Sequence, residues 1–169
     1  MINNDNVLID FNEKAKSYEW KSINDNVMGG ISNSRIEISQ QKTAIFSGFV
    51  SPENGGGFAS VRTDINVNNE FAFKGASIRV KGDGKIYSLR FRTYDNFDGI
   101  SYQSKFSTEN GIWRKFNLPF KKFKPTFRGM ILTPFKELQS ENIKQIGILI
   151  SDKQYGEFQL EIDWIKLYY

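Results

Sequence analysis

The sequence predicts an all-β fold, a β-sandwich or a barrel, and three observations support this prediction. Short stretches in which apolar and polar residues alternate follow one another along the chain, and helical periodicity is almost absent. Turn signals rich in Gly, Asn and Asp separate these stretches at nearly regular spacing. The aromatic content is 15%, and the apolar residues are weighted toward Phe, Tyr, Ile and Val, which favour strands. Because the 169 residues contain no linker or repeat, we expect one domain over residues 1–169.

The first part of the chain predicts five strands and two glycine-rich turns. Residues 34–39 and 43–50 flank a polar turn, so we expect them to pair as a hairpin. Asn, Asp and paired glycines mark residues 24–32 as a loop. The three consecutive glycines at 55–57 tolerate positive φ, and the chain continues from them directly into a strand. The strands predicted here are 7–11, 18–23, 34–39, 43–50 and 58–63.

The rest of the chain predicts six further strands. The clearest is 86–94, whose apolar face holds Tyr87, Leu89 and Phe91 and whose opposite face is polar and basic. We expect 119–134 to be a long connection whose phenylalanines close one end of the sandwich, and 136–142 to include a short helical segment. The first and last strands are strongly apolar, so we expect them to pair within a sheet. The predicted strands are 76–81, 86–94, 101–107, 113–118, 143–151 and 156–169.

The composition excludes several classes of site. The chain has no Cys and no His, which rules out disulfides, Cys-rich zinc sites, Cys nucleophiles and Ser-His-Asp triads. The net charge of +4 is compatible with an anionic partner but does not require one. No apolar run approaches the ~20 residues of a transmembrane helix, so we expect no membrane insertion. The first residues lack the basic flank and apolar stretch of a signal peptide, which predicts a cytoplasmic protein.

Several stretches together point to one known family. They are Trp20, Asn24-Asp25-Asn26-Val27-Met28-Gly29-Gly30-Ile31-Ser32-Asn33-Ser34, Phe46-Ser47-Gly48-Phe49-Val50-Ser51, Asn54-Gly55-Gly56-Gly57-Phe58-Ala59-Ser60-Val61-Arg62, Tyr87, Arg90-Phe91-Arg92, Trp113, Pro119-Phe120 and Phe127-Arg128-Gly129. In this combination the chain resembles the complex I intermediate-associated protein family, named for a mitochondrial factor that helps assemble NADH:ubiquinone oxidoreductase. The resemblance implies a galactose-binding-like jelly-roll sandwich, similar to carbohydrate-binding modules. It also implies an assembly or chaperone-like role, and it supplies no established catalytic residues.

One face of the predicted sheet is the first candidate for a ligand site. Arginine binds carboxylate or phosphate with two parallel hydrogen bonds, and aromatic rings stack on sugars. If the strands are adjacent, these side chains converge on one concave face that engages a protein partner or a carbohydrate. The alternative is a solvated face on which the cations pair with nearby acids. The candidate residues are Arg62, Arg79, Arg90, Arg92, Tyr94, Gln103, Lys105 and Trp113.

Glycine loops and carboxylates are the next candidates. Gly29-Gly30 and Gly55-Gly56-Gly57 could cradle a phosphate, but neither fits a phosphate-loop motif, and tight turns beside the sheet are the favoured interpretation. Similar jelly rolls often hold a structural calcium. Asp10 and Asp163, in the first and last strands, are the candidate ligands, with Asp25 a further oxygen donor. The favoured interpretation is that these carboxylates cap strands or turns.

Catalysis by carboxylates is the least favoured hypothesis. Asp95 and Asp98 flank a turn, and Glu53 and Glu109 lie in other loops, but Asp-x-x-Asp-Gly is more often turn chemistry. The Phe- and Lys-rich segment 113–135 suits a protein-docking surface, although phenylalanines that close one end of the sandwich are the favoured interpretation. No nucleic-acid motif is present. We therefore expect a non-catalytic protein-binding domain, an assembly or chaperone-like factor. The alternatives are a carbohydrate-binding module and, third, a carboxylate-based hydrolase.

Overall fold

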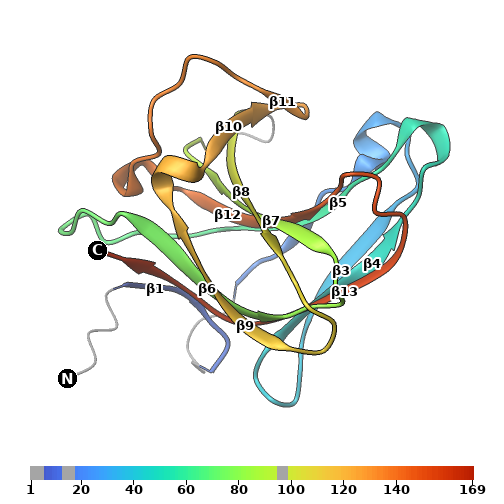
Figure 1. Ribbon diagram of the computed structural model, residues 1–169, viewed down its shortest axis with the longest axis horizontal. Coiled ribbons are helices and arrows are strands. Elements are labelled where there is room, and N and C mark those ends of the chain that lie inside the picture. The colour runs from blue at the N-terminus through green and yellow to red at the C-terminus, as the bar shows by residue number, and fades with distance from the viewer. Residues whose placement is uncertain (1–5, 13–17, 95–98) are drawn as a thin grey trace.

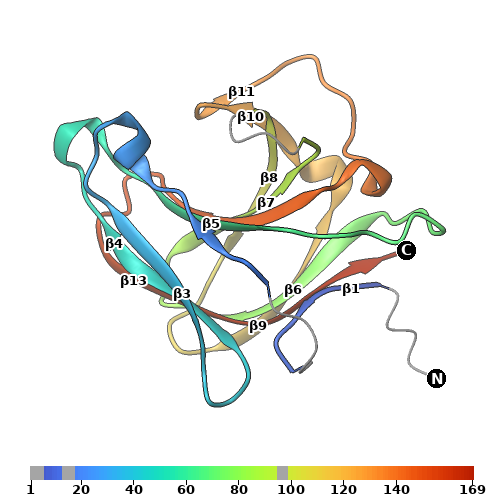
Figure 2. The same ribbon diagram turned by 180° about the vertical axis from the view of Figure 1, so that it is seen from behind.

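The computed structural model describes residues 6–12, 18–94 and 99–169. These residues form two antiparallel sheets that pack face to face (Figures 1 and 2). This arrangement confirms the prediction of an all-β jelly-roll sandwich. The helical segments are short 3-10 turns: η2 Asp25–Met28, η3 Glu53–Gly55, η4 Phe120–Lys122 and η5 Ser140–Asn142.

The first sheet, sheet A, is built around the last strand of the chain. Its order is β3-β4-β13-β6-β9, and β1 also pairs with β13. The strands are β1 Val7–Asp10, β3 Asn33–Ile38, β4 Ala44–Val50, β6 Gly75–Lys81, β9 Trp113–Pro119 and β13 Gly156–Tyr168. The pairing of β1 with β13 and the β3–β4 hairpin confirm two of the pairings predicted from the sequence.

The second sheet, sheet B, has the order β11-β10-β8-β7-β12-β5-β2. Its strands are β2 Lys21–Ser22, β5 Ala59–Asp64, β7 Ile86–Arg92, β8 Ser101–Ser107, β10 Lys124–Phe127, β11 Met130–Ile131 and β12 Gln145–Ile150. The sheet curves away from sheet A: β10 and β11 at one end, and η2 and η3 at the other, rise beyond β7, β12 and β5 (Figure 1). We call the side that points away from sheet A the outer face of sheet B.

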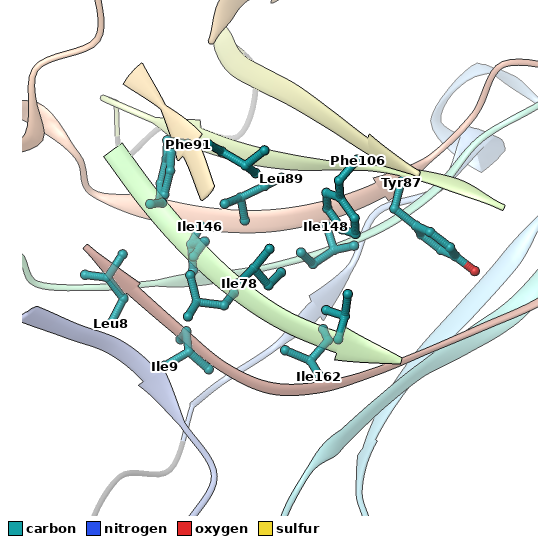
Figure 3. Packing of buried hydrophobic residues seen from close by; sticks show 14 of the residues in the cluster. Leu8, Ile9, Ile78, Tyr87, Leu89, Phe91, Phe106, Ile146, Ile148 and Ile162 are labelled. Atoms are coloured by element: carbon teal, nitrogen blue, oxygen red, sulfur yellow. The ribbon is translucent and has the colours of Figure 1, made fainter. Parts of the chain in front are cut away.

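The core lies between the two sheets and follows the alternation of the strands. Figure 3 shows Leu89, Phe91 and Ile148 of sheet B facing Ile78 and Ile162 of sheet A. All five side chains are fully buried, and burial of each contributes ~1.5–3 kcal/mol. The inward faces predicted for residues 76–81 and 86–94 are therefore confirmed. Because these residues point inward, the alternate residues of the same strands must point to the outer faces.

The segment 119–134 differs from the long connection that the sequence predicts. It contains η4 and the two short strands β10 and β11, and β10 extends sheet B beside β8. Phe120 and Phe123 are buried, as expected for side chains that close one end of the sandwich. The strands were missed because four residues that include Pro125 carry too short an alternation to be distinguished from a loop. The segment 136–142 forms only η5.

Candidate functional site

The outer face of sheet B is crossed by a row of polar and basic residues. Strand register places the members of the row side by side on adjacent strands, and in an antiparallel ladder paired residues share a face. From β10 to β2 the row is Lys124, Gln103, Arg90, Gly147, Arg62 and Lys21. Three residues predicted as ligand-binding, on three different strands, are thus brought into line.

Two further rows flank the central one on the same face. One consists of Thr126, Ser101, Arg92, Gln145 and Asp64. The other consists of Lys105, Ser88, Leu149 and Ser60. None of the paired positions in the three rows, all of which the structure describes, holds an aromatic ring. The centre of the face is therefore polar and basic rather than a stacking platform.

Arg90 lies at the centre of the face, close to two other cations. Burial, followed by repulsion from Arg92 and Arg62, lowers the pKa of the Arg90 guanidinium to about 10. Arg92 is itself only 8% exposed. The Nε–H group of Arg90 is buried and donates no hydrogen bond, and the buried Oε1 of Gln145 accepts none. A buried polar group without a partner is destabilising, so Arg90 and Gln145 each carry one group that lowers stability.

Gly147 separates Arg90 from Arg62 in the central row. A Cβ atom at this position would lie 2.8 Å from the carbonyl oxygen of Val61 and 3.2 Å from Cβ of Arg62. The first distance is shorter than a side chain can tolerate, so the close approach of β5 to β12 requires glycine here. As a consequence, no side chain stands between the two arginines on β12.

The other predicted residues of this face lie toward its edges. The Lys105 ammonium forms an ion pair of 2.8 Å with Asp152, and both side chains are about half exposed. Such a pair contributes little to stability. Tyr94 follows the end of β7 and is 52% exposed. Its ring is the one predicted aromatic group that lies near this sheet.

Arg79 and Trp113 do not lie on this face, which corrects the sequence prediction. They belong to β6 and β9 of sheet A. The Arg79 guanidinium lies 4.4 Å from the centre of the Trp113 ring and forms a 2.6 Å ion pair with Asp163. The alternation along a strand shows which residues share its face, but not which of two sheets the strand joins. The structure therefore separates these two residues from the arginines of sheet B.

The candidate calcium ligands do not fit a metal site. Asp163 forms an ion pair with Arg79. Oδ1 of Asp10 accepts hydrogen bonds from the backbone N–H and the side-chain amide of Asn12. Within residues 6–12, 18–94 and 99–169, no three acidic side chains gather into a group that could hold a metal ion. Calcium requires about 6–8 oxygen ligands. The geometry instead matches the alternative that these carboxylates support local structure.

Asp25 has a structural role, in line with the interpretation that the candidate carboxylates cap strands or turns. Its carboxylate is fully buried and accepts hydrogen bonds from N–H and Oγ of Ser32 and from N–H of Gly57 and Phe58. Burial opposes ionisation, but these hydrogen bonds outweigh it and lower the pKa of Asp25 below its usual 3.8. A Cβ at Gly30 or Gly56 would lie 2.4 or 2.5 Å from this carboxyl group. The glycines of both loops thus make room for Asp25.

Exposed apolar side chains lie at both ends of the outer face. At the η2 end, Val27, Met28 and Ile31 are exposed. At the β11 end, Met130 and Ile131 are exposed, and Met130 has 68% of its surface accessible. Figure 1 shows these two segments rising on opposite sides of the central strands of sheet B. The sequence singled out the second segment as a docking surface, but not the first.

The carboxylates weighed for catalysis gain no support from the described residues. Asp95 and Asp98 lie outside the part of the chain that the structure describes. Glu109 forms a 2.7 Å ion pair with Arg114, and Glu53 begins η3. The carboxylate-based hydrolase therefore stays an untested third hypothesis.

Comparison with known proteins identifies relatives over most of the chain. The family model described as "Complex I intermediate-associated protein 30 (CIA30)" matches residues 9–162. The probable complex I intermediate-associated protein 30, mitochondrial, of Caenorhabditis elegans is 27% identical over 169 residues, which cover 89% of this chain and 48% of the relative. The mouse complex I intermediate-associated protein 30, mitochondrial, is 26% identical over 182 residues, which cover 96% of this chain and 56% of the relative. The chain thus spans about half the length of the curated relatives it matches.

A solved structure supports the fold. The family 11 carbohydrate-binding module from Clostridium thermocellum, in complex with a mixed-linked tetrasaccharide, is similar with a TM-score of 0.65 and 15% identity. The match covers 96% of this chain and 94% of the module. At this identity the likeness concerns the fold, and it agrees with the galactose-binding-like jelly roll that the family resemblance implied.

The expectation of a cytoplasmic protein is wrong. The relatives from C. elegans and mouse are named mitochondrial proteins, and this finding overturns a prediction that was based on the first residues of the sequence. Among the described residues, no helix has the length and apolar character needed to cross a bilayer.

Proposed function

This chain belongs to the complex I intermediate-associated protein 30 family, and from that membership we propose that it is a non-catalytic, protein-binding assembly factor that docks its partner on the outer face of sheet B. The mitochondrial relatives carry the name of an intermediate of complex I, which supports a partner that is a protein. The partner of this chain would be a subunit or an assembly intermediate of a respiratory complex.

The observation that carries the proposal is the distribution of residue types over the outer face. Partly buried arginines occupy the centre, and exposed apolar side chains occupy both ends, around Met28 and Met130. Arg and Met are enriched in protein interfaces, and Arg is among the residues that dominate binding energy. A partner that covers both ends would bury the apolar groups and the centre together.

Photocrosslinking tests this assignment. A photocrosslinking amino acid is placed at Met28, at Met130 or at Ile38, one site per variant, and the proteins are expressed in their native cell. Ile38 is the control, because it is 59% exposed but lies on β3 of sheet A. We expect Met28 and Met130 to crosslink to the same protein and Ile38 not to do so. Crosslinks from Ile38 alone, or different proteins at the two ends, would contradict the proposal.

A second measurement distinguishes the carbohydrate-binding alternative from the proposed protein-binding function. The described rows of the outer face have no aromatic ring on which a sugar could stack, although the fold is that of carbohydrate-binding modules. A melting temperature that rises with the concentration of a mixed-linked β-glucan oligosaccharide would favour the carbohydrate module. An unchanged melting temperature, together with crosslinks at both ends of the face, is what we expect.

A further inference from the structure

We propose that the open edge of β11, with the lysines near it, binds an extended acidic segment of a polypeptide. We call this region the β11 edge site. It lies at the β10–β11 end of the proposed docking face, so the assignment of the segment to the protein partner rests on the proposed function. The site consists of Lys121, Lys122, Lys124, Met130, Ile131, Phe135 and Lys136.

The first argument is the distribution of charge along the chain. Residues 110–136 contain seven of the 23 Lys and Arg residues and none of the 19 Asp and Glu residues. The rest of the chain therefore holds more acids than bases, although the whole chain has a net charge of +4. A basic region of this kind attracts an acidic partner and raises the rate at which the two associate.

Four lysines of this region lie close to β10 and β11 in the chain and are exposed. Lys121 and Lys122 belong to η4, Lys124 begins β10, and Lys136 follows β11 by five residues. Within the described ranges, no Asp or Glu forms an ion pair with any of the four. Their ammonium groups are therefore available to acidic side chains of another molecule.

The second argument is the open edge of sheet B. β11 is the last strand of the sheet at this end, and no described strand pairs with its other side (Figure 1). The N–H of Leu132 donates a 2.9 Å hydrogen bond to the carbonyl oxygen of Pro125. Because hydrogen-bonded pairs alternate in an antiparallel ladder, the backbone N–H and C=O of the preceding residue, Ile131, point away from β10.

This edge favours a polypeptide over other anionic partners. An extended peptide adds to a sheet edge through its own backbone N–H and C=O groups. A lipid headgroup and a nucleic acid are also anionic, but neither has a backbone that continues a β-ladder. The basic charge and the open edge together therefore fit an extended acidic segment of a protein.

The third argument is the apolar surface beside the edge. Met130, Ile131 and Phe135 have 68%, 54% and 42% of their surfaces accessible. Ile131 is paired with Thr126, so it lies on the outer face of sheet B together with Lys124, two residues earlier in β10. A bound segment that carries apolar as well as acidic side chains would bury these groups and pair with the lysines at the same time.

The test titrates the isolated, nitrogen-labelled protein with three peptides. They are acetyl-Glu-Val-Glu-Val-Glu-Val-amide, the same peptide with Lys in place of Glu, and the Glu peptide with all its backbone nitrogens methylated. We expect the Glu peptide to shift the amide signal of Ile131 saturably and the Lys peptide to leave it unchanged. The methylated peptide cannot donate to the edge, so we expect it to bind at least about tenfold more weakly.

A pair of double variants tests the role of the lysines. In Lys121→Glu/Lys122→Glu we expect the affinity for the Glu peptide to fall at least about tenfold. Lys42→Glu/Lys153→Glu is the matched control, because it changes the net charge equally at two exposed turn positions away from β11, one between β3 and β4 and one between β12 and β13. We expect this control to bind the Glu peptide like the unaltered protein.

Three outcomes would overturn the proposal. Equal losses in the two double variants would show attraction by net charge alone. Equal affinity for the Glu peptide and its methylated form would show that the edge of β11 takes no part. Binding to phosphatidylserine vesicles that is lost in Lys121→Glu/Lys122→Glu, without binding of the Glu peptide, would assign the surface to a membrane. The three peptides are compared on the unaltered protein, so the test does not depend on the folding of a variant.

The titration and the crosslinking experiment can fail separately. If no peptide binds while Met28 and Met130 crosslink to one protein, the β11 edge site is wrong and the proposed function stands. If the Glu peptide binds saturably at Ile131 while Met28 and Met130 crosslink to no common protein, the edge site is supported and docking over the whole face is not.

Discussion

At the scale of single residues, Asp25 shows how the sequence motif most characteristic of this chain has a structural explanation. The paired glycines at 29–30 and the glycine run at 55–57 are far apart in the sequence, but both loops lie against the one carboxylate. Asp25 accepts backbone hydrogen bonds from Ser32, Gly57 and Phe58 and so joins η2 to the start of β5. The motif therefore positions the η2 end of the proposed docking face.

Asp25→Asn is predicted to destabilise the protein strongly at neutral pH. The amide would place a donor group against N–H donors in a buried position, and we expect a loss of at least about 3 kcal/mol in the free energy of unfolding. Because the pKa of Asp25 is lowered in the folded state, the carboxylate stabilises the fold above its unfolded pKa of 3.8. This contribution is lost as the pH falls below that value. The difference in stability between the unaltered protein and Asp25→Asn should therefore shrink in acid.

Urea unfolding at neutral and at acidic pH measures both effects. Asp152→Asn is the control, since the exposed pair of Asp152 with Lys105 contributes only ~0–1 kcal/mol. A variant Asp25→Asn as stable as the control at neutral pH would mean that the buried hydrogen bonds do not hold the two loops together.

At the scale of elements, β13 is the strand on which sheet A depends. It pairs with β4 through its first half, with β1 through its second half, and with β6 along its other edge. The short strand β1 adds Leu8 and Ile9 to the core between the sheets (Figure 3). The two ends of the described chain are thus held together by packing as well as by backbone hydrogen bonds.

Ile9→Ala is predicted to destabilise the fold by about 2–5 kcal/mol, because the Ile9 side chain is fully buried and its removal leaves a cavity. Ile38→Ala is the same chemical change on an exposed position of β3, and it should alter stability by no more than ~0.5 kcal/mol. Thermal unfolding, monitored by circular dichroism, compares the stability of the Ile9→Ala and Ile38→Ala variants. Equal effects would show that β1 is peripheral to the core.

At the scale of the whole molecule, the two sheets have different outer surfaces. On sheet A, cations are neutralised within the chain: Arg79 pairs with Asp163 and Lys81 with Glu161, and both cations lie over the ring of Trp113. On sheet B, burial and the nearby charges of Arg92 and Arg62 lower the pKa of Arg90. The same residue type thus forms an ion pair on sheet A and lies beside other cations on sheet B.

Calcium is predicted to have no effect on the melting temperature of the protein. The carboxylates of Asp10, Asp25 and Asp163 each accept hydrogen bonds from groups of this chain, and the described residues form no cluster of acids. Differential scanning fluorimetry with calcium chloride, and separately with a chelator, is the measurement. A melting temperature that rises with calcium and falls with the chelator would require a site that these residues do not form.

The all-β class, most strand positions and the inward faces of the central strands could be predicted from the sequence. These properties depend on alternation and turn residues, which are local and have a period of two. Residues 86–94 illustrate this, because Tyr87, Leu89 and Phe91 are buried as their spacing predicted. The short strands β10 and β11 could not be predicted, because their few residues carry no clear period.

The tertiary structure alone decided which predicted site residues lie together. Arg79 and Arg90 occupy equivalent outward positions in similar strands, yet β6 joins sheet A and β7 joins sheet B. Pairing between strands is a long-range choice, governed by the packing of the whole core rather than by the residues of one strand. The same cause places Gly147 between Arg62 and Arg90, and two loops around Asp25. The sequence by itself thus determined the fold class, and the tertiary structure decided the composition of the proposed site.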